Sequence, residues 1–109
     1  MQIRFTSKKL GKTLTQEKEM VREYGAECAA KIKRRMMELG AADNLLLLPP
    51  AARCHPLEGD RKGQFAVDLQ HPFRLIFEPS CDEILLKEDG SLDIGRVTGI
   101  IIIDIVNYH

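Results

Sequence analysis

The sequence has 109 residues, of which 44% are hydrophobic and 29% are charged, and its sixteen basic residues balance its sixteen acidic ones. This length and composition predict one globular domain over residues 1–109, with a single modest core. No apolar run is long enough to cross a bilayer, and residues 1–12 lack the hydrophobic stretch of a signal peptide.

The three cysteines, Cys28, Cys54 and Cys81, are an odd number without any C-x-x-C spacing. We therefore expect neither a disulfide framework nor a zinc knuckle, and a reducing, cytoplasmic location. Cys54 adjoins His55, but no second pair of ligands has a spacing that suits a metal. The glycine motifs that bind nucleotides are also missing, so no cofactor is expected.

The neutral total conceals two oppositely charged halves. Residues 1–63 carry thirteen Lys or Arg and eight Asp or Glu, a net charge of +5, whereas residues 64–109 carry three and eight, a net charge of −5. A domain segregated in this way can present a basic surface to a polyanion. On charge alone, an ordinary solvated helix surface is the favoured interpretation.

The first part of the chain predicts a short strand followed by helices. Alternation at 2–5 indicates a strand, and Ser7 is a suitable N-cap for a short helix that reaches about Leu14. From Thr15 to Gly40, apolar residues recur at three- and four-residue steps, which predicts an amphipathic helix. They are Val21, Tyr24, Cys28, Ile32, Met36 and Leu39.

Two glycines and a group of cations qualify this long helix. Gly25 can divide it in two, a question that the sequence leaves open, and Gly40 is expected to end it. Its second half carries Lys31, Lys33, Arg34 and Arg35. These cations form a rim beside the apolar stripe, which either contacts phosphates or is a solvated helix face.

The second part of the chain predicts strands. Residues 41–63 form a connector with one helical turn near Asp43 and a path broken by two prolines. Segments 64–69 and 73–78 alternate as strands around a hairpin turn. Asp89-Gly90 predicts a tight turn, and the apolar run within 97–108 predicts a long inner strand. Helices followed by an antiparallel sheet make an α+β fold.

Alternation along these strands predicts which residues face the helices. The core-facing residues are Phe65, Val67, Leu69, Phe73, Leu75, Phe77, Ile101, Ile103 and Ile105. On the opposite face, which is predicted to be open and polar, Arg74 and Tyr108 lie together. An arginine between apolar neighbours has either a ligand or an ion pair, and Asp68 and Glu78 are the candidates for such a pair.

Several residues suit chemistry on an RNA phosphate. The set is His55, Arg61, Lys62, Arg74, Tyr108 and His109. Cleavage at an RNA phosphate needs cations for the anionic transition state, an acceptor for the ribose 2′-OH proton and a donor for the departing 5′ oxygen. Histidine and tyrosine can move these protons, although His55, which precedes a proline, can equally be a loop residue.

The segment CHPLEGDRKGQFAVDLQHPFRLIFEP and the final IVNYH resemble the HigB toxins of the RelE/ParE superfamily. The family pattern runs approximately H-x-L-x-G-[DN]-R-x-G, then a strand, [WYF]-R-[IL]-x-F and a terminal D-Y-H. The N-terminal IRF and KKL and the ELGAADNL connector are also similar, so the resemblance covers nearly the whole chain.

The resemblance implies a small RNase fold, with helices on one face of an antiparallel sheet. It further implies a toxin of a type II toxin–antitoxin pair that cuts mRNA on the translating ribosome and is inhibited by a cognate, HigA-like antitoxin. His55, Arg74, Tyr108 and His109 match the family's active-site positions, and Arg61 and Lys62 fall in its basic loop. We expect Lys31, Arg34 and Arg35 to hold flanking phosphates.

Two departures from the family pattern leave other functions open. Asn107 replaces the usual Asp, and Glu58 replaces a common Lys, which weakens acid–base chemistry and removes a cation. A degenerate, inactive toxin is therefore one alternative. A same-fold toxin that inhibits DNA gyrase by protein contact is another, and a DNA-binding repressor is a third, although no helix-turn-helix is evident.

Overall fold

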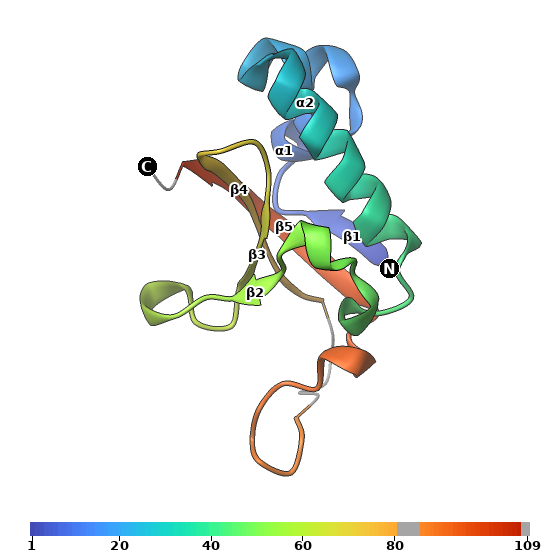
Figure 1. The fold of residues 1–109 in the computed structure, drawn as a ribbon, viewed down its shortest axis with the longest axis vertical. Helices are drawn as coiled ribbons and strands as arrows, with labels where there is room; N and C mark the ends of the chain where they lie inside the picture. Colours follow the sequence, from blue (N-terminus) through green and yellow to red (C-terminus); the bar gives the residue numbers. More distant parts are fainter. Residues whose placement is uncertain (81–85, 108–109) are drawn as a thin grey trace.

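Two helices cover one face of a five-stranded sheet in the computed structural model, which describes residues 1–80 and 86–107 (Figure 1). The strands are β1 (Gln2–Phe5), β2 (His55–Pro56), β3 (Phe65–Asp68), β4 (Phe73–Pro79) and β5 (Gly99–Asn107), and the helices are α1 (Lys8–Thr15) and α2 (Glu17–Ala41). The strand order is β1-β5-β4-β3-β2. The predicted α+β class is confirmed.

The sheet is mixed rather than purely antiparallel, which corrects one detail of the prediction. β1 pairs parallel to β5, with Gln2 opposite Gly99, whereas the other neighbours pair antiparallel. Parallel strands need a long connection, and nearly the whole chain separates these two. The predicted inner position of β5 is confirmed, because β1 and β4 flank it.

The first helix begins where the sequence predicts it. Ser7 has an extended backbone, and its Oγ accepts a hydrogen bond of 3.1 Å from the N–H of Leu10. This contact satisfies one of the donors that the start of a helix leaves open. Leu14, at the other end of α1, is 1% exposed and joins the core.

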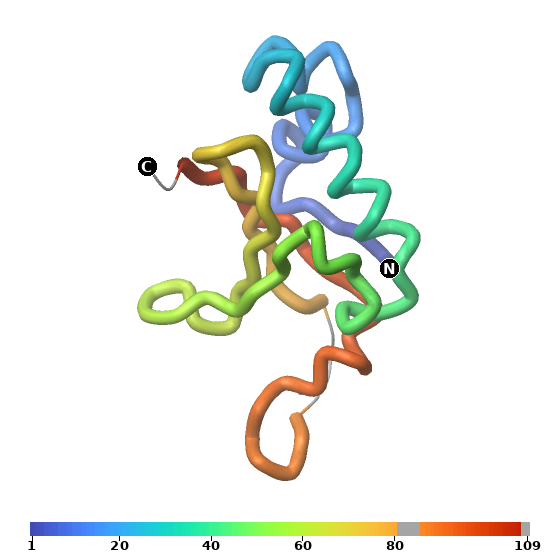
Figure 2. Tube along the Cα trace, viewed as in Figure 1, coloured from blue at the N-terminus to red at the C-terminus, as the bar shows by residue number. Residues whose placement is uncertain are grey.

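Gly25 divides α2 into two helical parts. Its angles, φ 84° and ψ 165°, lie in a region that essentially only glycine adopts. The chain turns back there (Figure 2), and Lys33 Nζ donates to Glu17 Oε1 at 2.9 Å across sixteen residues. The structure thus decides a question that the sequence left open. The break also explains why Val21 is 40% exposed although it shares the spacing of buried Ile32.

The second helix ends at Ala41, so the prediction of Gly40 as its terminator is wrong. Gly40 is still helical, and Ala42 is the capping residue. The terminal ammonium of Met1 donates hydrogen bonds to the carbonyls of Leu39 and Ala42, at 3.2 and 2.6 Å. A positive charge at this end complements the helix dipole and satisfies open carbonyls, so a left-handed glycine is not required.

A bulge in β5 reverses the facing of two isoleucines that were predicted to lie in the core. The register between β4 and β5 shifts between Ile76 and Phe77. The extra residue of β5 moves the alternation by one position. Ile102 is consequently fully buried, whereas Ile101 and Ile103 are only half-buried. The predicted core residues that are buried as expected are Phe65, Val67, Leu69, Leu75, Phe77 and Ile105.

The face of the sheet opposite the helices is closed over the middle of β3 and β4, although Asp104, which pairs with Ile76, is exposed on β5. Ala66 and Ile76, predicted to lie on an open polar face, are both 0% exposed. Asp68 is the last residue of β3 and Arg74 is the second residue of β4, and both remain partly exposed. The prediction of an open face is therefore corrected for its centre and holds at the edge where Asp68 and Arg74 lie.

The connector between α2 and β3 contains more local structure than predicted. It forms three single 3₁₀ turns, η1 (Leu45–Leu47), η2 (Pro50–Ala52) and η3 (Gly59–Arg61). The turn predicted near Asp43 corresponds to η1. Of the remaining structure, η2 and β2 were missed, because prolines mark breaks without specifying what lies between them.

We expect Gly25→Ala to lower the free energy of unfolding by about 1–3 kcal/mol, because a side chain disfavours this backbone conformation. Nothing lies within 4 Å of the place that a Cβ would take at this position, so strain and not a clash causes the loss. Gly40→Ala is the matched control, since it is also unobstructed but helical. It should raise stability by about 0.5–1 kcal/mol. Urea unfolding measures both changes, and equal effects would contradict this explanation.

Candidate functional site

The candidate site is a cavity where three segments meet at the outer end of the sheet. Arg53, Cys54 and His55 lead from η2 into the edge strand β2, while Asp68 and Arg74 lie directly opposite each other on β3 and β4. These five residues line a cavity of about 440 Å³. The sequence placed His55 and Arg74 in one site, and the structure brings both to this cavity.

The carboxylate of Asp68 joins two guanidinium groups at this cavity. Its Oδ1 lies 3.4 Å from Nε of Arg74, and its Oδ2 lies 3.3 Å from Nε of Arg53. Of the two acidic partners considered for Arg74, Asp68 is the one observed. With one carboxylate for two guanidinium groups, these three side chains carry a net positive charge, as an anion-binding site requires.

His55 is held in one tautomer by the backbone of Arg53. Its Nδ1 lies 2.8 Å from the carbonyl oxygen of Arg53. A carbonyl oxygen can only accept, so the Nδ1 atom carries the proton and the neutral ring has its lone pair on Nε2. The half-buried ring lines the cavity. His55 is therefore fixed as a residue that can accept a proton through Nε2.

Arg35 has a structural position, which corrects its predicted role as an RNA-contacting cation. It is 4% exposed. Its Nε donates to the carbonyl of Asp68 at 2.7 Å, one terminal nitrogen donates to the carbonyl of Ala51 at 2.9 Å, and the other donates to Glu38 Oε1 at 2.7 Å. Because the side chain is buried and each of its three guanidinium nitrogens donates to an acceptor of the protein, it is not available to a phosphate at the surface.

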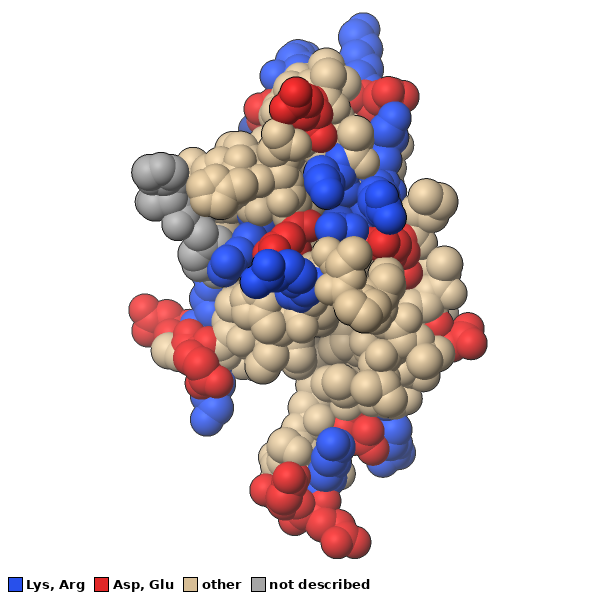
Figure 3. Space-filling view, in the orientation of Figure 1, with Lys and Arg blue, Asp and Glu red and all other residues tan. Residues whose placement is uncertain are grey.

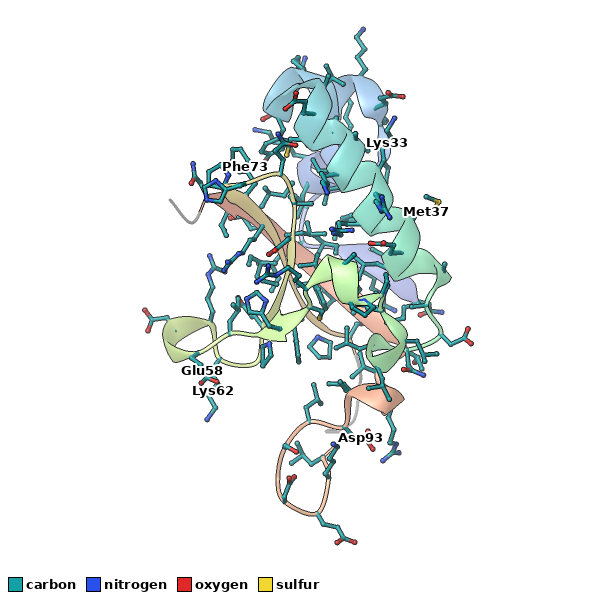
Figure 4. The ribbon with its side chains drawn as sticks, viewed as in Figure 1. Lys33, Met37, Glu58, Lys62, Phe73 and Asp93 are labelled. Atoms are coloured by element: carbon teal, nitrogen blue, oxygen red, sulfur yellow. The ribbon has the colours of Figure 1, made fainter. Side chains whose placement is uncertain are left out.

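The predicted basic loop lies apart from the cavity. Arg61 is half-buried and donates to Gln64 Oε1 at 3.0 Å, whereas Lys62 is exposed. Figure 4 shows Lys62 and Glu58 at the outer end of this loop, directed away from the body of the protein. The structure does not place Arg61 or Lys62 among the cavity residues.

Lys31 and Arg34 are exposed on α2. Arg34 lies 3.6 Å from Glu38 in a solvent-exposed ion pair, an arrangement that leaves its charge available to other anions. Lys and Arg side chains gather across the middle of the face in Figure 3, with acidic side chains between them. The two predicted helix cations therefore remain on the surface, unlike Arg35.

Tyr108 and His109 lie outside the described residues. The residue before them, Asn107, is exposed and pairs with Phe73, the neighbour of Arg74 in β4. Phe73 lies at this end of the sheet beside the end of β5 (Figure 4). The described part of β5 thus ends one residue pair away from Arg74.

Sequence reasoning missed Arg53 as a site residue and treated Asp68 only as a partner for Arg74. The signal for Asp68 was present, because the alternation of both strands places it on the same face as Arg74. Nothing in the sequence marks Arg53. It caps η2 with φ 53° and ψ 46°, a left-handed conformation that is uncommon outside glycine, asparagine and aspartate.

Two features are absent from residues 1–80 and 86–107, a cluster of metal-ligating side chains and a helix that could span a membrane. No group of three or more side chains there is arranged to hold a metal ion. No helix in the same ranges has both the length and the apolar character to cross a bilayer.

Burial raises the pKa of the Cys54 thiol to about 11, so this cysteine is protonated at neutral pH and is a poor nucleophile.

One comparison with known proteins found a similar structure. The fold is similar to that of a YoeB/ParE toxin from Agrobacterium tumefaciens, with a TM-score of 0.61 and 13% sequence identity over 100% of both chains. No family model and no curated protein matches the sequence. At this identity the likeness establishes a shared fold and does not establish a shared activity.

We expect Arg35→Met to lower the free energy of unfolding by about 2–4 kcal/mol, because it leaves two partly buried carbonyls and the Glu38 carboxylate without their donor. Arg34→Met is the matched control: it removes the same charge from the same helix at a side chain that is 64% exposed. Its effect should stay within about 0.5 kcal/mol. Denaturant titration of both variants tests this, and a similar loss in each would contradict a special role for Arg35.

Native Cys54 should react about 100-fold more slowly with iodoacetamide at pH 7.5 than a thiol with a pKa of 9.0, because the raised pKa lowers its thiolate fraction by that factor. The rate should rise about tenfold per pH unit until pH approaches 11. Mass spectrometry of the Cys54 peptide measures this rate. Labelling in urea is the control and should abolish the protection, while fast labelling of the native chain would show that the thiol is not desolvated.

Proposed function

We propose that this protein is the toxin of a type II toxin–antitoxin pair and that it cleaves mRNA on the translating ribosome by general acid–base catalysis, without a cofactor. The observation that carries this proposal is the convergence of His55 and Arg74 on one cavity. The fold shared with a YoeB/ParE toxin over the full chain supports it. So does the resemblance of the sequence to HigB toxins.

His55 is suited to begin the reaction. Its unprotonated Nε2 can accept the proton of a ribose 2′-OH as the oxygen attacks the neighbouring phosphorus. Arg74 contributes positive charge where negative charge develops on the phosphoryl oxygens. In this proposal Tyr108 and His109 supply the remaining proton transfers, including the proton for the departing 5′ oxygen. DNA lacks the 2′-OH, so the chemistry is restricted to RNA.

The flanking nucleotides of the RNA would follow four cations outside the cavity, of which three are exposed and one, Arg61, is half-buried. Lys31 and Arg34 lie on α2, and Arg61 and Lys62 lie in the loop that contains η3. Each contact to a phosphate releases counterions, which makes such binding strong at low salt and weak at high salt. Arg35 is excluded from this set because it is buried.

The partners in this proposal are mRNA on the ribosome and a HigA-like antitoxin in the cytoplasm. The toxin that shares the fold carries the name ParE as well as YoeB, which favours one second candidate. In that case the chain would inhibit DNA gyrase by protein contact and would need no proton-transfer groups. The two functions differ in a product that can be measured, namely cut mRNA.

Induced expression should produce new mRNA 5′ ends, and Arg74→Ala or His109→Ala should reduce them by about 10²-fold or more, the usual contribution of one charge-stabilising group or one acid–base group. Tyr108→Phe should reduce them as well, through loss of the hydroxyl. Arg96→Ala is the control, since Arg96 is an exposed cation in η4 (Ile94–Arg96) and does not line the cavity. Sequencing of 5′ ends after induction measures all four variants.

Two results would reject the proposal. Unchanged cleavage in Arg74→Ala and His109→Ala would remove these residues from the mechanism. Growth arrest with loss of DNA supercoiling and without new mRNA ends would establish the gyrase alternative instead.

A further inference from the structure

We infer that Arg53 is a second phosphate-binding residue of this site and that Asp68 occupies, in the free protein, the place of an RNA phosphodiester between Arg53 and Arg74. The inference rests on the proposed function and deepens it by naming a residue that binds substrate and an internal group that the substrate replaces. Three observations carry it: the geometry of the shared carboxylate, the exposure of Arg53 and the conformation of its backbone.

The shared carboxylate shows that both guanidinium groups can reach one small anion. Each oxygen of Asp68 faces one of them, Oδ1 toward Arg74 and Oδ2 toward Arg53, at 3.4 and 3.3 Å. A phosphodiester offers the same features, a single negative charge shared by two non-bridging oxygens. The planar guanidinium group is the side chain best matched to such two-oxygen anions.

The ion pair of Arg53 is one that a phosphate can replace. The side chain of Arg53 is 78% exposed and that of Asp68 is 28% exposed. Exposed ion pairs contribute little to stability, so exchange of one anion for another at this guanidinium is not opposed by the fold. Asp68 meanwhile keeps its place through its backbone carbonyl, which accepts from buried Arg35.

The backbone of Arg53 connects the phosphate to the proposed proton acceptor. Its left-handed angles accompany a carbonyl that accepts from Nδ1 of His55, while its side chain extends to Asp68. A residue with a side chain at Cβ adopts this conformation at some cost. One residue thus orients the acceptor through its carbonyl and contacts the anion through its guanidinium.

Glycine at position 53 separates these roles. Arg53→Gly keeps the carbonyl and suits the positive φ, so the thermal midpoint should be unchanged or raised. It removes the whole side chain of Arg53, including the guanidinium that contacts Asp68, and leaves the carbonyl that accepts from His55. A loss of RNA binding in a variant that is at least as stable cannot come from misfolding.

The test is binding of a short single-stranded RNA that is 2′-O-methylated at every ribose and therefore cannot be cut. Fluorescence anisotropy over a range of salt concentrations measures the dissociation constant of the full-length chain. We expect Arg53→Gly to raise it about tenfold and to lower the salt slope by about one. Arg4→Ala, which removes an exposed cation from β1 at the opposite edge of the sheet, should change the dissociation constant by less than about twofold.

Asp68→Asn tests the second half of the inference by the sign of its effect. If Asp68 occupies the phosphate position, its neutralisation should lower the dissociation constant several-fold. Weaker binding by Asp68→Asn would overturn this assignment, and equal binding by Arg53→Gly and Arg4→Ala would overturn the role of Arg53. RNA that does not bind to the unchanged chain would overturn both.

RNA cleavage and RNA binding are measured in separate experiments. The proposed nuclease function and the proposed phosphate site at Arg53 can therefore be rejected independently. New mRNA ends together with normal binding by Arg53→Gly would leave the nuclease and remove the inference. Binding that depends on Arg53, without any new mRNA ends in cells, would leave the phosphate site and remove the nuclease.

Discussion

The arrangement of the site depends on the hydrogen bonds of the buried Arg35 guanidinium. A charge inside a protein is tolerated only when its donors are satisfied, and Arg35 donates to the carbonyls of Asp68 and Ala51 and to the side chain of Glu38. Those carbonyls belong to the end of β3 and to the turn that leads into Arg53. One helix residue therefore fixes two of the three segments that supply the cavity, and the helix cannot shift without disturbing the site.

In the proposed function, the contacts of Arg35 help to orient the groups that would meet an anion. Asp68 holds two guanidinium groups through its side chain while its own backbone carbonyl is held by Arg35. The Arg53 carbonyl fixes the proton of His55 on Nδ1. An anion bound by the guanidinium groups would not break the two backbone contacts, from Arg35 to the carbonyl of Asp68 and from His55 to the carbonyl of Arg53. Such orientation allows polar groups to act on developing charge without first rearranging.

The sequence predicted those cavity residues that are marked by their side-chain type or by strand alternation. It did not predict those whose position depends on a long-range contact. His55 and Arg74, which both line the cavity, were candidates because their side chains suit the chemistry and Arg74 interrupts an apolar alternation. Arg53 was missed, since a left-handed arginine after a 3₁₀ turn resembles any loop arginine in sequence. Arg35 was assigned to the surface because its neighbours Lys33 and Arg34 are there. Its burial depends on carbonyls 16 and 33 residues away, which no local pattern reveals.

Sequence patterns alone were enough to predict the order and type of the main elements, the cap at Ser7 and the burial of most core-facing residues of β3 and β4. These follow from local hydrogen bonding and from the two- and 3.6-residue periods of strands and helices. The parallel pairing of β1, the reversal at Gly25 and the facing of Ile101 and Ile103 are evident only in the folded chain. Each of these depends on a contact with a distant segment. β1 pairs with the free edge of β5, Glu17 pairs with Lys33 across the reversal, and one extra residue in β5 shifts its register with β4.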